Sequence, residues 1–184
     1  MTHDMTTSRL DLHLITSAEL FALVSIPPER DPFAHRLFNN PHQVLTGETI
    51  PHANRIADVR NNPEHIKWYY RLIVHRADNI LIGSASFHAA PDEHGMLEIG
   101  LGITPTYTGQ GFATEAIIGM WDWASQQPEV TTLRYTVSPT NRASQAIISK
   151  FPVEHKGQQI DEEDGPEDIY EISANAWQSF RSQQ

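Results

Sequence analysis

Residues 98–117 read EIGLGITPTYTGQGFATEAI, which predicts a strand, a short turn and the start of a helix. Because side chains of a strand alternate between two faces, one face of this strand is apolar. Its members are Ile99, Leu101 and Ile103. The other face carries Glu98 followed by Gly100 and Gly102, and glycines inside a strand often mark a place where a ligand or another backbone comes close. The stretch therefore predicts a nearly bare strand face that begins with a carboxylate.

The turn after this strand has the composition of an anion site. Gly109 and Gly111 let successive backbone amides converge, and the start of the following helix adds a partial positive charge. A pyrophosphate would suit such a loop. The loop lacks the Lys-Ser/Thr ending of a nucleotide-binding P-loop and the GxGxxG fingerprint of a dinucleotide site. On these residues alone, a plain structural turn stays open as the alternative.

The length and composition predict one folded domain over residues 1–184, with a flexible N-terminus at 1–9 and a C-terminal tail at 173–184. The chain is 39% hydrophobic and 20% charged, which is typical of a soluble globular protein. No apolar run reaches the roughly 18 residues that span a bilayer. The N-terminus does not have the basic and then apolar pattern of an export signal, so we expect a cytoplasmic protein.

Charge and cysteine content restrict the chemistry. The chain has no cysteine, which excludes disulfides, thiolate nucleophiles and cysteine-ligated zinc. A formal net charge of −10 disfavours nucleic acids and anionic membranes as partners and mildly favours a cationic or amine partner. We expect a monomer or a homodimer.

The hydrophobic pattern predicts an α/β (α+β) fold with a mixed, mostly antiparallel sheet of about six to seven strands flanked by helices. Strands are expected over residues 10–14, 68–75, 80–88, 96–103, 131–137, 153–160 and 168–172. Helices are expected over residues 17–25, around Phe33, around Asn54, over 111–125 and from the cap at 138–141 to about 151.

Two motifs carry a resemblance to a known family. Residues 98–117 resemble the acetyl-CoA-binding core of the GCN5-related N-acetyltransferases (GNAT), in the RimJ/RimL branch of ribosomal-protein N-terminal acetyltransferases. The later run NRASQAIISK, residues 141–150, resembles the Asn-x-x-Ser helix of the same branch. The likeness covers Leu10 to Ile172, although residues 27–64 match only by position. It implies a GNAT fold and transfer of an acetyl group from the co-substrate acetyl-CoA to a primary amine, by direct attack in a ternary complex.

The resemblance also implies a role for each matching residue. Backbone amides of the loop would hold the cofactor pyrophosphate, and the loop residues concerned are Thr108, Gly109, Gln110, Gly111, Phe112, Ala113 and Thr114. Ile103 would contact the pantetheine arm through its backbone, and Asn141 would hold the pantetheine from the later helix. Glu98 occupies the position of the usual general base. Ser144 would lie near the sulfur and assist the departing thiolate.

The sequence departs from the family pattern in three places. Thr108 replaces a long polar side chain but leaves the loop amides in place. Ile148 stands where many relatives have a tyrosine acid, and Phe151-Pro152-Val153 replaces the usual Leu-Gly-Phe. These departures keep open a non-catalytic acyl-CoA-binding sensor or interaction module. A fold without any CoA site would require both motifs to be coincidences.

The acceptor stays open between a protein N-terminal α-amine and a small-molecule amine. No metal is expected, because the ten histidines show no ligand spacing such as His-x-x-x-His. The acidic run DEEDGPED, residues 161–168, lacks the alternating ligands of a calcium loop and predicts a solvated hairpin tip. Whether residues 27–64 cover the acceptor site is not decided by their sequence.

Overall fold

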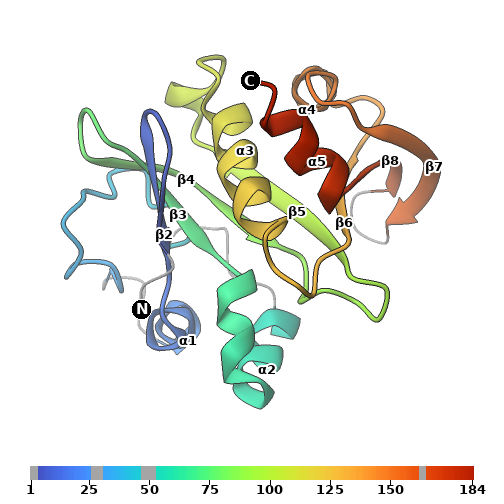
Figure 1. Ribbon diagram of the computed structural model, residues 1–184. Coiled ribbons are helices and arrows are strands. Elements are labelled where there is room, and N and C mark those ends of the chain that lie inside the picture. The colour runs from blue at the N-terminus through green and yellow to red at the C-terminus, as the bar shows by residue number, and fades with distance from the viewer. Residues whose placement is uncertain (1–3, 26–30, 47–52, 162–164) are drawn as a thin grey trace. The chain divides into compact units, whose positions relative to one another are not determined.

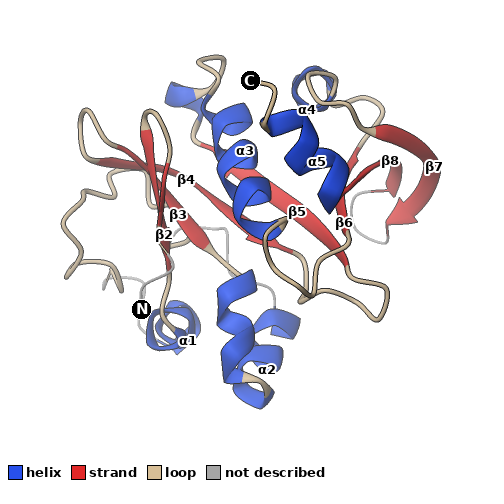
Figure 2. Ribbon diagram, viewed as in Figure 1, coloured by secondary structure: helices blue, strands red, loops and turns tan. Residues whose placement is uncertain are grey.

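The computed structural model describes residues 4–25, 31–46, 53–161 and 165–184 (Figure 1). The described strands form one sheet in the order β1-β2-β3-β4-β5-β6-β8-β7. Most neighbours are antiparallel, β5 and β6 pair in parallel, and helices flank the sheet, as Figure 2 shows. The predicted fold class is therefore confirmed. The sheet has eight strands where about six to seven were predicted, because the N-terminal segment adds a strand of its own.

The strands are β1 Met5–Thr6, β2 Leu10–Leu14, β3 Arg71–His75, β4 Ile80–Phe87, β5 Met96–Ile103, β6 Thr132–Val137, β7 Glu154–Asp161 and β8 Gly165–Ser173. The α-helices are α1 Ser17–Ser25, α2 Ala53–Asn61, α3 Phe112–Ala124, α4 Arg142–Ile148 and α5 Ala174–Arg181. Two short 3₁₀ helices are η1 Pro63–Trp68 and η2 Pro105–Tyr107.

The chain forms two compact units. The first contains residues 1–87 and 101–119, and the second contains residues 88–100 and 120–184. Strand β5 and helix α3 each contribute residues to both. The single domain expected over residues 1–184 stays a prediction.

In the first unit, β2, β3 and β4 form an antiparallel ladder over an apolar core. The core members are Ile15, Leu20, Phe33, Leu45, Ile56, Val59, Tyr69, Tyr70, Leu72, Val74 and Leu81. A partly buried ion pair joins α1 to the segment at 31–46, since the Arg36 guanidinium donates to both carboxylate oxygens of Glu19 at 2.7 Å. Burial raises the pKa of Glu19, but the hydrogen bonds from Arg36 and Thr16 leave it below its ordinary value.

Two predictions fail in this unit, and a third stays untested. The helix expected around Phe33 is absent, because Asp31 Oδ1 accepts a 2.7 Å hydrogen bond from Phe33 N and the described residues there form turns. The strand expected from residue 68 begins at Arg71, since η1 occupies the preceding residues. The N-terminus expected to be flexible over 1–9 contains β1 and Arg9, while residues 1–3 lie outside the described part, and its flexibility stays a prediction.

In the second unit, β6 pairs with β5 on one side and with β8 on the other, and β7 and β8 form a hairpin. The segment expected to be a tail from residue 173 onward is instead mostly helix α5, and the Ser173 side chain caps it by accepting from Ala176 N. Its Trp177 is fully buried, with its ring centroid 5.1 Å from that of Trp121. An aromatic anchor thus fixes the C-terminal helix.

Candidate functional site

The glycine loop, residues 108–114, has the backbone that its sequence predicts. Gly109 has a φ of +74° and Gly111 a φ of +84°. L-residues with a side chain rarely adopt this left-handed conformation, so glycine is needed at both positions. Helix α3 begins immediately afterwards at Phe112. The loop therefore turns sharply onto a helix start, where backbone amides lack intrahelical acceptors.

The loop amides are available to a ligand. Within the described part of the chain, no group accepts a hydrogen bond from the backbone amides of Gly109 to Ala113. Thr114 is not counted among these available residues, because it already takes part in an interaction within the protein. Unpaired amides at a helix start suit an anion such as a phosphate, because the helix dipole adds to their partial positive charge. The residues present thus fit the pyrophosphate that the sequence led us to expect.

Side chains of the glycine loop stabilise its shape. Phe112 is buried, and its ring centroid lies 4.9 Å from that of His75 and 6.1 Å from that of Tyr107. Thr108 Oγ1 donates to Pro105 O at 2.8 Å, and Gln110 Nε2 donates to Thr106 O at 3.3 Å. Because these side chains are engaged in packing or turn closure, the backbone is the part of the loop that a ligand can use.

Strands β5 and β6 are paired over only part of their length. Their parallel register runs from Met96 opposite Thr132 to Ile99 opposite Tyr135. Strand β5 continues to Ile103 beyond the last of these pairs. The predicted pantetheine contact, Ile103, thus lies on the part of β5 that has no partner residue on β6.

Glu98 is held by two neighbours through one of its oxygens. Its Oε1 accepts a 2.5 Å hydrogen bond from Thr136 Oγ1 and lies 3.3 Å from His88 Nδ1. The Glu98 side chain is only 14% exposed. Its Oε2 has no hydrogen-bond partner among the described residues. The carboxylate is therefore fixed in orientation with one oxygen left to accept a proton.

His88 and Thr136 were not identified from the sequence. The spacing of the histidines gives no role to His88, although its position in the sequence carries a signal. His88 ends the strand predicted before that of Glu98, and its amide donates to Glu98 O at 2.9 Å. Gly100 explains how the imidazole fits, since a Cβ at Gly100 would come within 2.7 Å of His88 Nε2. The bare strand face thus accommodates a histidine ring beside the carboxylate.

Ser144 interacts with a buried tyrosine, Tyr135, that the sequence motifs do not indicate. Burial raises the pKa of Tyr135, and a hydrogen bond from the Ser144 side chain offsets part of that rise. Because the neighbouring Thr136 on β6 points toward Glu98, the Tyr135 side chain points to the opposite face of the strand.

Asn141 is the N-cap of α4, with Oδ1 accepting a 3.1 Å hydrogen bond from Ser144 N. Its side-chain nitrogen has no partner within the described residues and stays available to a ligand. Ile148, which replaces the expected tyrosine, is buried. The predicted site residues thus fall into two groups: Ile103 and the glycine loop in the first unit, and Glu98, Asn141 and Ser144 in the second.

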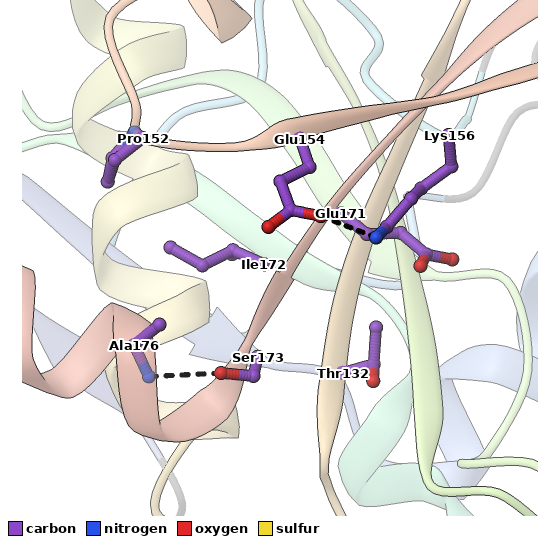
Figure 3. A pocket seen from close by; sticks show the side chains of 8 residues that line it. All are labelled: Thr132, Pro152, Glu154, Lys156, Glu171, Ile172, Ser173 and Ala176. Atoms are coloured by element: carbon purple, nitrogen blue, oxygen red, sulfur yellow. Dashed lines mark hydrogen bonds and ion pairs between the residues drawn. The ribbon is translucent and has the colours of Figure 1, made fainter.

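A pocket of about 250 Å³ in the second unit contains none of these residues (Figure 3). It is lined by Thr132, Pro152, Glu154, Lys156, Glu171, Ile172, Ser173 and Ala176. Its charged groups are already paired, Lys156 with Glu154 at 2.5 Å and Glu171 with Arg134 at 2.6 Å. The charged side chains of this pocket are thus engaged in ion pairs, and the predicted site residues lie elsewhere.

Among the described residues, no three His, Asp or Glu side chains gather as metal ligands. None of the helices in this described part of the chain combines the length and the apolar character needed to cross a membrane.

Comparisons with known proteins agree with the fold. An uncharacterized N-acetyltransferase, YjdG of Bacillus subtilis strain 168, is 30% identical over 112 residues, which cover 59% of this chain and 65% of that protein. The match thus spans just under two thirds of the relative's length. The solved ribosomal-protein-S5-alanine acetyltransferase of Vibrio fischeri has a TM-score of 0.64 at 13% identity, covering 95% of this chain and 98% of that one.

The solved ribosomal L7/L12 α-N-protein acetyltransferase RimL, in complex with coenzyme A, has a TM-score of 0.63 at 15% identity and covers 95% of this chain and 99% of that one. At such identities the likeness to the two solved structures shows the fold. The model of the acetyltransferase (GNAT) domain family matches residues 9–151, which include Glu98, the glycine loop and the Asn141 helix. The chain belongs to the GNAT acetyltransferase family.

Proposed function

We propose that this protein transfers the acetyl group of acetyl-CoA to a primary amine, by direct attack of the amine in a ternary complex. The observation that supports this most strongly is the glycine loop, whose amides from Gly109 to Ala113 have no acceptor among the described residues. Bound acetyl-CoA would supply the activated thioester. The loop would hold its pyrophosphate, and the backbone of Ile103 and the free side-chain nitrogen of Asn141 would hold its pantetheine arm.

Glu98 is the proposed general base. An amine must lose a proton before it attacks, which at pH 7 costs roughly 1.4 kcal/mol for an α-amine and roughly 4.6 kcal/mol for a lysine. Thr136 and His88 orient Oε1 of Glu98, and Oε2 is free to take that proton directly or through a water. The carboxylate thus has one oxygen fixed and the other without a hydrogen-bond partner among the described residues, which suits a base.

Ser144 is proposed to assist the departing thiolate. An ordinary thiol ionises near pH 8.5, so the leaving group needs only modest help at neutral pH. Burial raises the pKa of Tyr135 and the Ser144 side chain lowers it in part, so we propose that the Tyr135 hydroxyl is the neighbour that returns a proton to Ser144. This pair would supply the hydroxyl that the family's usual tyrosine supplies from the position of Ile148.

The acceptor is proposed to be either a protein N-terminal α-amine, by similarity to the RimJ/RimL branch, or a small-molecule amine. A net charge of −10 favours a cationic acceptor of either kind over nucleic acid or an anionic membrane surface. We propose that the protein acts in the cytoplasm as a monomer or homodimer.

The alternative is an acyl-CoA-binding module without catalysis. It is favoured by the buried Ile148 in place of a tyrosine acid. The two functions differ in whether any amine consumes acetyl-CoA, while both require that the ligand binds.

A thiol-release assay separates them. Because the chain has no cysteine, released CoA is the only thiol in the reaction, and panels of peptides and small amines can be screened with a thiol reagent. We expect turnover that falls about 100-fold or more in Glu98→Gln. The matched control is Glu93→Gln, since Glu93 is 86% exposed on the same unit. Acetyl-CoA binding without turnover on any amine would favour the module instead.

A further inference from the structure

Arg9, between β1 and β2, reaches the glycine loop from the N-terminal segment. Its Nη1 donates to Gln110 O at 3.0 Å, and its Nε donates to Glu115 Oε2 at 2.7 Å. The guanidinium carbon lies 4.3 Å from the centroid of the Phe112 ring. One side chain therefore contacts the middle of the loop, the first residue of α3 and the first turn of that helix.

The contact with Gln110 O has a consequence for the next amide. The peptide bonds of the described residues are trans, so the Gln110 carbonyl and the Gly111 N–H point in opposite directions from one plane. Because Arg9 holds the carbonyl toward itself, it turns the Gly111 N–H away. Glycine at 111 has no side chain to resist rotation of this peptide, so the hydrogen bond supplies the restraint.

Arg9 is itself fixed, although its side chain is 44% exposed. Glu115 Oε1 accepts hydrogen bonds from Thr7 Oγ1 and from Arg9 N, each at 2.6 Å. Its Oε2 accepts the hydrogen bond from the Arg9 guanidinium. Burial raises the pKa of Glu115, but these hydrogen bonds outweigh it and leave the pKa below its ordinary value. The carboxylate is thus charged at neutral pH and holds both the backbone and the side chain of Arg9.

We propose that Arg9 is a positioning residue of the phosphate site, which fixes the Gly111 amide toward the pyrophosphate of acetyl-CoA. The inference rests on the proposed function, since it assigns that ligand to the glycine loop. The N-terminal segment thereby becomes part of the cofactor site.

The test compares two ligands and three variants. Affinity for acetyl-CoA is measured by titration calorimetry, and affinity for S-acetylpantetheine, which has no pyrophosphate, by an NMR titration that follows weak binding. Arg9→Ala should weaken acetyl-CoA binding by about tenfold or more, the equivalent of one charged hydrogen bond, and leave S-acetylpantetheine within about twofold. Arg9→Lys keeps a charge for Glu115 but lacks the forked guanidinium that also reaches Gln110 O, so it should retain thermal stability and still lose affinity for acetyl-CoA.

Arg76→Ala is the matched control. Arg76 is 43% exposed, and it fastens the same N-terminal turn through hydrogen bonds to Thr7 O at 2.8 Å and Leu10 O at 3.0 Å. Its variant should bind acetyl-CoA as the wild type does. If Arg9→Ala matched Arg76→Ala, or weakened both ligands equally, the inference would be wrong while the proposed function stood. If the wild type bound no acetyl-CoA, both would fall.

Discussion

Thr136 Oγ1 donates a 2.5 Å hydrogen bond to Glu98 Oε1, from one parallel strand to its neighbour. The two residues belong to β6 and β5, close to the point where the paired register of these strands ends. A short hydrogen bond to a carboxylate is stronger than one between neutral groups, and it fixes both the position and the rotation of the acceptor. The orientation of the proposed base therefore depends on a hydroxyl from the next strand.

Thr136→Val removes this hydroxyl at nearly constant shape. We expect turnover to fall by about tenfold or more, because the base loses a charged hydrogen bond of roughly 1.5–3 kcal/mol, while acetyl-CoA affinity stays unchanged. Thr136→Ser should restore most of the rate. Steady-state kinetics together with titration calorimetry check this, and a Val variant with normal kcat would show that Thr136 does not position Glu98.

Gly100→Ala displaces His88 without changing either partner of the His88–Glu98 pair. The added Cβ would lie 2.7 Å from His88 Nε2, at the end of a side chain that is 46% exposed and can swing aside. We expect a melting temperature close to that of the wild type and a turnover reduced by about as much as in His88→Ala. If Gly100→Ala kept full activity while His88→Ala was inactive, the contribution of His88 would not depend on its position beside Glu98.

Glu115→Gln should change how stability depends on pH. The pKa of Glu115 lies below its ordinary value of 4.5, so its charged form stabilises the fold above that pH, and the stabilisation disappears as the pH falls through the folded-state pKa. The difference in free energy of unfolding between wild type and variant should therefore be largest above about pH 5 and shrink in more acidic solution. Urea unfolding across this range measures it, and a difference that grew toward acid would contradict the assignment.

Local patterns predicted the regular elements well. The bounds of β2, α1 and β5 agree with those expected from hydrophobic periodicity and capping, and the helix expected at 111–125 differs from α3 by one residue at each end. The glycine loop was also predicted, because two closely spaced glycines indicate a sharp turn. Both glycines have positive φ angles in the structure. The prediction of a helix around Phe33 was wrong, because a hydrogen bond from Phe33 N to the Asp31 side chain stabilises a turn there instead of a helix. Trp68, Tyr69 and Tyr70 resembled strand by composition, but a 3₁₀ helix and its end occupy those positions.

The contacts around the site could be predicted only in part. The sequence motifs predicted site roles for Glu98, Asn141 and Ser144. Asn141 caps its helix, as its residue type suggests. The neighbours of these residues depend on pairing between distant segments. Arg9 and Glu115 are 106 positions apart, and Thr136 and Glu98 are 38 apart, so no local pattern joins them. Helix α5 was missed because burial of Trp177 against Trp121, not helix propensity alone, holds it.

The measurement that tests the central claim most directly is calorimetric titration of the purified protein with acetyl-CoA, beside the variant Gly111→Glu. The control is Gly157→Glu, which introduces the same charge at another glycine of positive φ, on β7 in the other unit. If the glycine loop holds the pyrophosphate, the wild type and Gly157→Glu bind acetyl-CoA in the micromolar range and Gly111→Glu loses binding. A wild type that binds no acetyl-CoA, or a Gly111→Glu variant that binds as well as the control, would contradict the account.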